Sequence, residues 1–358
     1  MSRAIELAWR GWGQVHPNPM VGAVVLRDGQ LIGEGYHARY GDAHAEPMAL
    51  EQAGGQARGA TLVVTLEPCS HVGKQPPCVE AIIAAGVRRV VMAQEDPNPE
   101  ARGGAERLRA AGVEVQDGIL RAEASYQCAA FRHRFTTPDR PFVGLKLATS
   151  VDARIADRDR QSSWVSEEPA RDYVHWLRAG FDAIAVGAGT ARSDDPRLTV
   201  RGSVSPRIPP ARVVFTRSGE LPDHLAVTRA VPDSATYVVT VGESRRSDPQ
   251  KPGGEGEAVV EIRATTLVEA LGALGRAGIA TILVEGGGGF GAQLLAEGLV
   301  DRFYWIQSPL WLGEEGVPAF PGLPSPPLRD AERWSVMERR PLGRDTLLVM
   351  DRSACLPD

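Results

Sequence analysis

The stretch Thr61-Leu-Val-Val-Thr-Leu-Glu-Pro-Cys-Ser-His-Val-Gly-Lys-Gln-Pro-Pro-Cys78 decides the fold of the first part of this chain. It begins with an apolar, β-branched run over 61–66, which predicts a strand. It ends at Cys78, where a helix is predicted over 78–85. The chain therefore passes from a strand to a helix here, with two Pro-Cys pairs in the connection. Strands that alternate with helices form a sheet covered by helices.

The sequence on either side continues this alternation. Upstream, we expect an amphipathic helix over 3–12, a hairpin of strands 21–26 and 31–36 turned at Asp28-Gly29, and a helix over 43–52. Downstream, strands over 89–93 and 113–116 alternate with helices over 105–111 and 122–134. This order predicts a largely parallel sheet between helices.

A domain boundary is expected at Thr136-Thr-Pro-Asp-Arg-Pro141, where two prolines interrupt both helix and strand periodicity. The prediction is two α/β domains, over 1–138 and 139–358. In the second, strands are expected over 142–148, 183–186, 212–215, 237–241, 281–284, 302–307 and 346–350. Helices are expected over 168–179, 267–277 and 292–298.

Composition excludes several classes of protein. The 358 residues carry 40 Lys+Arg against 45 Asp+Glu, a net charge of −5, which argues against a nucleic-acid coat. No apolar run reaches the roughly 20 residues that cross a bilayer, and the N-terminus lacks the pattern of a secretion signal. Four cysteines are too few for a disulfide framework, so we expect a cytoplasmic protein without membrane partners.

His44, Cys69 and Cys78 are candidate zinc ligands, and Glu46 stands beside the first of them. One imidazole and two thiolates suit a tetrahedral catalytic zinc whose fourth position holds a water. Glu46, in the first helical turn, suits proton transfer better than ligation. Taken singly, a His-x-Glu pair is usually a solvated helix face, and two cysteines nine apart are usually core or structural-metal residues. Their combination predicts a zinc deaminase.

The quoted stretch, together with His16-Pro-Asn-Pro19 and Gly33-Glu-Gly-Tyr-His37, resembles the bifunctional deaminase/reductase family of riboflavin biosynthesis. The resemblance covers nearly the whole chain. It implies a cytidine-deaminase-like three-layer first domain that holds one zinc ion on His44, Cys69 and Cys78, with Glu46 as the proton shuttle. It also implies substrate contacts at Asn18, His37, Lys74, Asp96 and Asn98. As alternatives, His71 only orders its loop and 96–99 is only a turn.

The stretch Thr281-Ile-Leu-Val-Glu-Gly-Gly-Gly-Gly-Phe-Gly291 runs from an apolar strand into glycines, which suits a phosphate-binding turn or a plain flexible one. Together with 144–152, 161–164 and 193–201, it resembles the reductase half of the same family. That resemblance implies a dihydrofolate-reductase-like fold and NADPH as the coenzyme. The implied NADPH contacts are Ala148, Trp164, Thr190, Asp194, Gly287, Gly288, Gly289, Phe290, Gly291, Ala292 and Gln293. The implied substrate contacts are Ser162, Arg178, Leu198, Arg201 and Glu285.

Lys146 and Glu285 are charged residues in otherwise apolar strands, and burying such charges is costly unless they are paired or used. We interpret both as catalytic groups of the reductase; the alternative is that they pair only with each other. The sequence departs from the family at Ala153, where glycine is usual, and at Thr216-Arg217, so no cofactor contact is assigned near 217.

The expected function is therefore zinc-dependent deamination of a phosphorylated diaminopyrimidinone, followed by NADPH-dependent reduction of its ribosyl group to ribityl. A homo-oligomer formed through the reductase half is an expectation from the family. Two rivals stay open: a nucleoside or nucleic-acid deaminase with an accessory domain, and a zinc-binding module without activity. The second would need a fourth protein ligand and would have no use for Glu46.

Overall fold

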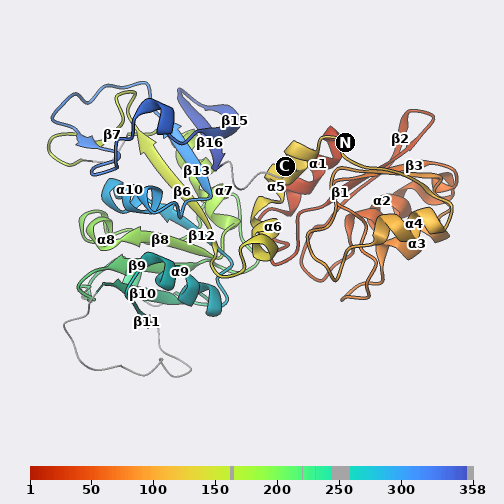
Figure 1. The fold of residues 1–358 in the computed structure, drawn as a ribbon, viewed down its shortest axis with the longest axis horizontal. Coiled ribbons are helices and arrows are strands. Elements are labelled where there is room, and N and C mark those ends of the chain that lie inside the picture. The colour runs from red at the N-terminus through yellow and green to blue at the C-terminus, as the bar shows by residue number, and fades with distance from the viewer. Residues whose placement is uncertain (162–164, 220, 230, 243–258, 353–358) are drawn as a thin grey trace. The chain divides into compact units, whose positions relative to one another are not determined.

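The computed structural model describes residues 1–161, 165–219, 221–229, 231–242 and 259–352. By their internal contacts the described residues divide into two compact units, one over 1–136 and one over 137–352 (Figure 1). None of the helices in the described ranges combines the length and the apolar character needed to cross a bilayer.

The first unit is built on a five-stranded sheet in the order β2-β1-β3-β4-β5. Its strands are β1 (Gly22–Arg27), β2 (Gln30–Tyr36), β3 (Thr61–Val64), β4 (Arg89–Met92) and β5 (Glu114–Gln116). The hairpin is confirmed, but β1 is antiparallel to both β2 and β3, so only β3, β4 and β5 are parallel. The expectation of a largely parallel sheet was therefore wrong for this half, because a tight two-residue turn forces the chain to reverse.

Helices cover both faces of this sheet, which gives three layers (Figure 1). On one face, α2 (Ala45–Ala53), α3 (Cys78–Ala84) and α4 (Gly104–Ala110) pack against the strands in one apolar cluster. On the other, α1 (Ser2–Ala8) packs on Val24 and Val63. The helix predicted over 122–134 is divided at Cys128 into α5 (Arg121–Gln127) and α6 (Ala129–Thr136).

Two glycines of β2 let α2 rest directly on the strand. A Cβ atom added at Gly33 would lie 2.2 Å from the carbonyl oxygen of Ala49, and one added at Gly35 would lie 2.2 Å from that of Ala45. Both contacts are far closer than any side chain allows, so only glycine fits. This close packing fixes the beginning of α2, where His44 and Glu46 lie.

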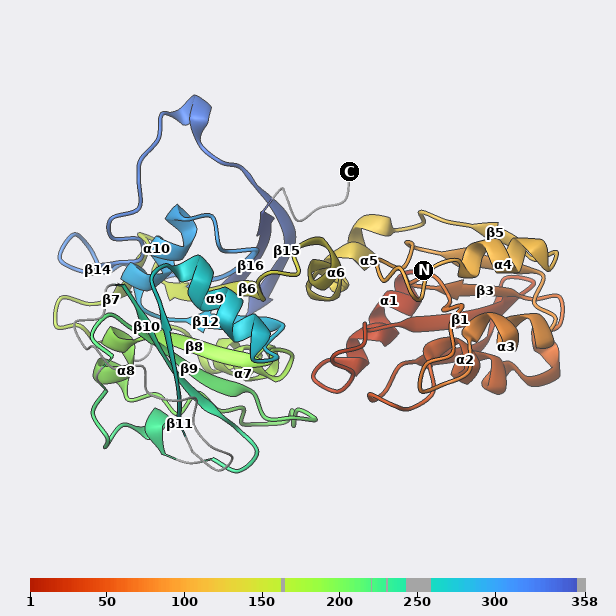
Figure 2. The same ribbon diagram turned by 60° about the horizontal axis from the view of Figure 1, so that its bottom comes forward.

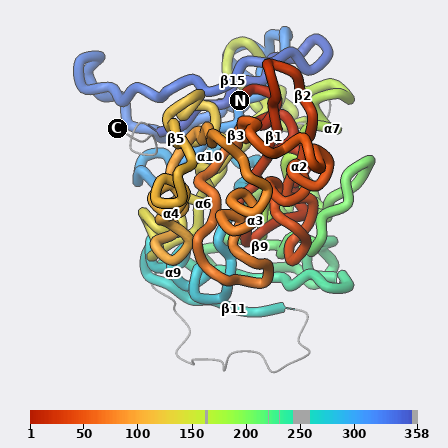
Figure 3. Tube along the Cα trace, turned by 90° about the vertical axis from the view of Figure 1, so that its right-hand side faces the viewer, coloured from red at the N-terminus to blue at the C-terminus, as the bar shows by residue number. Residues whose placement is uncertain are grey.

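In the second unit, the described residues form a nine-stranded sheet in the order β11-β10-β9-β8-β12-β6-β13-β16-β15. Figure 3 shows β11 and β15 at opposite ends of this sheet. The strands are β6 (Phe142–Thr149), β8 (Ala183–Gly187), β9 (Ala211–Thr216), β10 (Thr236–Val241), β11 (Val259–Ala264), β12 (Thr281–Glu285), β13 (Arg302–Gln307), β15 (Trp334–Leu342) and β16 (Asp345–Arg352). Along this strand order, every neighbouring pair from β11 through β10, β9, β8, β12 and β6 to β13 is parallel. The pairs β13–β16 and β16–β15 are antiparallel. A short pair, β7 (Arg154–Ala156) and β14 (Val317–Pro318), lies apart.

Helices α9 (Leu267–Arg276) and α10 (Gly288–Ala296) cover one face of the long sheet (Figure 2). The other face packs against α8 (Ala188–Asp194), and α7 (Glu168–Ala179) reaches it through Arg178. The predicted start of α10 at 292 was wrong, since the glycines form its first turn. A Cβ atom at Gly288 would lie 2.6 Å from the carbonyl oxygen of Ala319, so close packing here requires the glycine that makes the helix hard to predict.

Ala153, where the resemblance implies glycine, adopts a left-handed backbone with φ of 56°. That conformation costs a non-glycine residue roughly 1–2 kcal/mol. Glycine avoids this strain but loses more conformational entropy on folding, which costs roughly 0.5–1 kcal/mol. We therefore expect Ala153→Gly to raise the free energy of unfolding by about 0.5–1 kcal/mol, measured by urea denaturation. Ala156→Gly, in strand β7, is the matched control and should lower it. Equal destabilisation by both changes would show that Ala153 is not strained.

Candidate active sites

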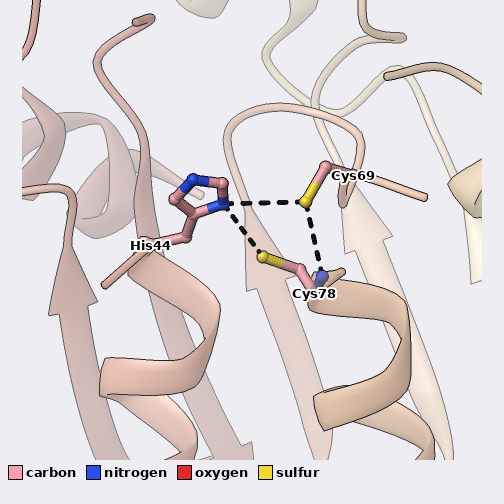
Figure 4. A group of neighbouring side chains, drawn as sticks. All are labelled: His44, Cys69 and Cys78. Atoms are coloured by element: carbon pink, nitrogen blue, oxygen red, sulfur yellow. Dashed lines mark hydrogen bonds between the residues drawn. The ribbon is translucent and has the colours of Figure 1, made fainter. Parts of the chain in front are cut away.

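Three element boundaries of the first unit bring the predicted zinc ligands together (Figure 4). His44 precedes α2, Cys78 begins α3, and Cys69 follows β3. The Nδ1 atom of His44 lies 3.2 Å from Sγ of Cys78 and 3.6 Å from Sγ of Cys69. All three donor atoms lie within 4.8 Å of one another. This donor set and spacing fit a zinc ion with three protein ligands.

The electrostatics of the cluster favour metal binding. Hydrogen bonding with Cys78 and with His44 lowers the pKa of the Cys69 thiol, so this sulfur is held as the thiolate that zinc requires. Within the part of the chain that the structure describes, the cluster contains no fourth His, Cys, Asp or Glu. The remaining position of a tetrahedral ion would thus be available to a small molecule.

Glu46 lies in the first turn of α2 and is 3% exposed. Burial raises the pKa of its carboxyl group to about 7, against the opposing effect of His44. A carboxyl group with a pKa near neutrality can both take up and release a proton at physiological pH.

A cavity of about 230 Å³ opens beside this cluster. It is lined by Glu46, by His44 and Cys69, and by every residue predicted to contact the first substrate: Asn18, His37, Lys74, Asp96 and Asn98. Residues more than 70 positions apart in the sequence thus line the same cavity.

Several polar side chains of the cavity are held in place by contacts with neighbouring groups. Nδ2 of Asn18 lies 3.2 Å from Nε2 of His37, and Nδ1 of His37 lies 3.1 Å from the carbonyl oxygen of Ala43. Burial lowers the pKa of His37, so its imidazole is neutral. The ammonium group of Lys74 lies 4.1 Å from the ring centre of Tyr40, where it is held as an exposed cation at the mouth.

Glu285, Arg178 and Lys146 meet in the second unit. Nε and Nη2 of Arg178 donate to the two carboxylate oxygens of Glu285 at 2.6 and 2.8 Å. Burial alone would raise the pKa of Glu285, but Arg178 outweighs it, and the net pKa is lowered. Lys146 is the residue of β6 paired in register with Glu285 of β12, and burial lowers its pKa. The predicted alternative, a pair of Lys146 with Glu285 alone, was therefore wrong: Arg178 is the partner in the ion pair.

A second cavity, of about 790 Å³, lies at the carboxyl ends of β8, β9 and β10. From the predicted NADPH contacts it is lined by Gly289, Phe290 and Gln293 at the amino end of α10. Arg192 and Arg217 also line it, although neither was predicted as a contact. A helix amino end and two arginines suit a phosphate-bearing coenzyme, so the residues present fit NADPH.

The other described residues among the predicted NADPH contacts do not line this cavity. Thr190 is beside Gly287, where an added Cβ atom would lie 2.7 Å from its Oγ1 atom. Asp194 is exposed and accepts from the Ser193 hydroxyl at 2.6 Å. Among the described residues, those that line the cavity include neither of these two, nor Ala148, Gly287, Gly288, Gly291 or Ala292.

Among the predicted substrate contacts of this unit, Arg178 binds Glu285 and also donates from Nη1 to the carbonyl oxygen of Thr199, next to Leu198, at 2.9 Å. Leu198 has a buried side chain in the core, so only its backbone is available to a ligand. Arg201 is exposed, and its backbone N–H donates to Nδ1 of His175 at 3.2 Å. Ser162 and Trp164 lie outside the described residues.

Comparison with known proteins identifies the family of this chain. The family model of the cytidine and deoxycytidylate deaminase zinc-binding region matches residues 1–94, and that of the RibD C-terminal domain matches residues 141–348. The chain belongs to the RibD family.

The riboflavin biosynthesis protein RibD of Escherichia coli is 38% identical over 97% of both chains. That of Aquifex aeolicus is 39% identical over 88% of this chain and 87% of its own. A solved structure of RibD from Acinetobacter baumannii superposes with a TM-score of 0.82 at 34% identity, covering 98% of this chain and 97% of that one. A diaminohydroxyphosphoribosylaminopyrimidine deaminase/5-amino-6-(5-phosphoribosylamino)uracil reductase from Thermotoga maritima gives 0.81 at 36% identity, with the same coverage.

These matches confirm the predicted family, the two fold types and an enzyme with deaminase and reductase activities that uses zinc and NADPH. Sequence reasoning did not single out Glu67, Tyr40 or Phe131, which also line the first cavity of this RibD-family chain. Glu67 had a visible signal, because it lies two residues before a zinc ligand in the stretch that identified the family.

Proposed function

We propose that this chain catalyses two successive steps of riboflavin synthesis. The first is hydrolytic deamination of 2,5-diamino-6-ribosylamino-4(3H)-pyrimidinone 5′-phosphate. The second is NADPH-dependent reduction of the ribosyl group, which yields 5-amino-6-ribitylamino-uracil 5′-phosphate. The observation that carries the proposal is the His44, Cys69 and Cys78 cluster beside buried Glu46, in one cavity with the predicted pyrimidine contacts. The name of the Thermotoga maritima relative, which states both activities, supports it.

In the deaminase site, zinc bound to His44, Cys69 and Cys78 would lower the pKa of a water, so that this water could lose a proton and act as a nucleophile at neutral pH. Glu46 takes the proton that the attacking water loses and gives it to the departing amino group, which leaves as ammonia. Its pKa of about 7 matches both halves of that transfer. Three protein ligands and a use for Glu46 argue against the zinc module without activity.

The other groups of this cavity recognise the substrate. Asp96 and Asn98 offer a carboxylate and an amide to the polar edge of a pyrimidinone. Asn18 and neutral His37 form a hydrogen-bonded pair on the same wall. Lys74, exposed at the mouth, supplies the cation for the 5′-phosphate.

In the reductase site, bound NADPH would supply the hydride. Arg178 holds the Glu285 carboxylate with two hydrogen bonds, and Lys146 lies at the paired position of the next strand. Lys146 and Glu285 orient the opened ribosyl carbon and deliver the accompanying proton, while Arg201 binds the phosphate end. The glycine-rich turn over 287–293, with Ala148, Thr190, Asp194 and Trp164, holds the coenzyme, and Ser162 and Leu198 complete the substrate contacts.

The two chemistries belong to separate domains, over 1–138 and 139–358. A cytoplasmic location suits the thiol ligands, which must stay reduced. The chain assembles into a homo-oligomer through the reductase domain, where Trp311 is 75% exposed and offers an apolar contact.

The test is to incubate the protein with the diamino substrate, with and without NADPH, and to weigh the products by mass spectrometry. Without NADPH we expect a gain of about one dalton, because an amino group is replaced by oxygen; with NADPH, two further hydrogens are added. Cys69→Ala, which removes a zinc ligand, should abolish the first change and spare reduction of substrate already deaminated. No mass change with the unaltered protein contradicts the proposed function, and loss of both activities in folded Cys69→Ala contradicts separate domains.

A further inference from the structure

Glu67 is a buried carboxylate that the proposed chemistry does not use. It follows β3 by three residues, precedes Cys69 by two, and is 4% exposed. Burying a carboxylate is costly unless hydrogen bonds replace the lost water. Three backbone N–H groups donate to this one: that of Asp96 to Oε2 at 3.1 Å, and those of Gly103 and Ala105 to Oε1 at 3.2 and 2.9 Å.

Each carboxylate oxygen thus holds a different segment. Oε2 holds the segment after β4 that carries Asp96 and Asn98, and Oε1 holds the turn that begins α4. The backbone of Glu67 is itself fixed, because its N–H donates to the carbonyl oxygen of Gln94 at 2.9 Å. One side chain therefore ties the segment that leads to Cys69 to two neighbouring segments.

The turn that begins α4 also lies directly against the chain beside Cys69. A Cβ atom added at Gly104 would lie 1.8 Å from the carbonyl oxygen of Pro68. The Ser70 hydroxyl donates to the carbonyl oxygen of Arg102 at 2.7 Å. The residues on either side of the zinc ligand Cys69 thus contact the turn that begins α4, and the Glu67 carboxylate binds the same turn.

The backbone of Asp96 is held at both its N–H and its carbonyl oxygen. Its N–H donates to Glu67, and its carbonyl oxygen accepts from Nε of Arg102 at 3.2 Å. Its own carboxylate accepts the N–H of Asn98 at 2.8 Å, and Asp96 is 5% exposed. The position of the Asp96 carboxylate in the cavity is therefore set by the backbone N–H of Asn98 and by the side chains of Glu67 and Arg102.

We propose that Glu67 is a positioning residue of the deaminase: it fixes Asp96 and Asn98 relative to Cys69, so that the pyrimidine ring is bound in register with the zinc ligands. This inference rests on the proposed function, since it assigns Asp96 and Asn98 to the substrate. Glu67 lines the cavity, but backbone N–H groups occupy both of its carboxylate oxygens, so it acts through Asp96 and not as a zinc ligand.

The test is Glu67→Gln in the full chain. A glutamine has one acceptor oxygen, and its NH₂ group cannot accept an N–H. Because two N–H groups share Oε1, we expect the amide oxygen to stay with Gly103 and Ala105 and the Asp96 N–H to lose its acceptor. A hydrogen bond to a charged group contributes enough that KM for the diamino substrate should rise roughly tenfold or more. The value of kcat should stay within about threefold, and zinc content and the reductase rate should be unchanged.

Two comparisons separate positioning from general stability. Glu80→Gln is the matched control, because Glu80 is an exposed partner of Arg107 in the same unit and does not contact Asp96; its KM should equal that of the unaltered protein. In an Asp96→Ala background, Glu67→Gln should add less than about a twofold change in KM, because contacts that act through one residue are not additive.

The inference would be overturned by an unchanged KM in folded Glu67→Gln. It would also be overturned if KM of the double variant rose by the product of the two single-variant increases. Should Glu67→Gln fail to fold, Arg102→Gln decides, since Arg102 is exposed and holds the carbonyl oxygen of the same residue, Asp96. It should raise KM in the same direction by about threefold, and no rise there overturns the inference as well. Absence of deamination in the unaltered protein would instead contradict the proposed function itself.

Discussion

Replacing Glu46 with glutamine is expected to lower the turnover number of deamination by about 100- to 10,000-fold, the usual contribution of a positioned proton carrier. The glutamine keeps the size and burial of the side chain but cannot take up or release a proton at neutral pH. Glu46 is 3% exposed, so bulk water does not readily replace it. Turnover is followed by ammonia release or product mass.

The controls for this result are close at hand. Zinc content should stay at about one ion per chain, and reduction of deaminated substrate should be unaffected, since Glu46 is not among the three ligands. Glu51→Gln, on an exposed position of the same helix, should deaminate normally. Near-normal turnover in Glu46→Gln would remove Glu46 from the mechanism.

Replacing Glu285 with glutamine should have the largest effect in the second unit. Removing one partner of a buried ion pair typically costs about 3–5 kcal/mol, because the other charge is left without compensation. The side chains of Arg178 and Glu285 are 12% and 10% exposed, so the cost applies to them. We expect a fall in the free energy of unfolding and a strong loss of reductase turnover, with NADPH affinity and deamination almost unchanged.

The pH dependence of stability gives a second measure of the same pair. Because the folded-state pKa of Glu285 is lowered below its unfolded value, its contribution to stability is present above the unfolded pKa and lost as pH falls through the folded one. In Glu285→Gln this acid-side loss should shrink. Glu297→Gln, exposed on the surface of the same unit, is the matched control. Reduction at the normal rate by Glu285→Gln would leave Glu285 a structural role only.

The zinc cluster was predictable because its evidence is local. His44, Cys69 and Cys78 each lie at an element boundary that apolar periodicity and prolines mark in the sequence. Ligand chemistry then restricts what an imidazole and two thiols can do together. The central strands were predictable for a related reason, since a strand buried on both faces is a short, continuous apolar run.

The parts that escaped prediction depend on tertiary contacts. The edge strands β11 and β15 contain polar as well as apolar residues. They were not predicted, because an edge strand needs no continuous apolar run. That Arg178 rather than Lys146 is the ion-pair partner of Glu285 follows from how α7 lies on the sheet, 107 positions away in sequence. Glu67 carries no motif for positioning; its role is visible only once the N–H groups of Asp96, Gly103 and Ala105 are seen to converge on it.

The strand order of the second unit has a consequence for synthesis on the ribosome. The first unit is complete in sequence by Thr136, so its core can be buried while translation continues. Strand β6 is made next, yet its two neighbours in the sheet are β12 and β13, which come late in the chain. At roughly 5–20 residues per second, the stretch from Thr149 to Gln307 takes about 8–30 s to emerge. For that interval β6 has neither of its neighbours in the sheet, so the apolar residues of this central strand cannot yet be buried between them.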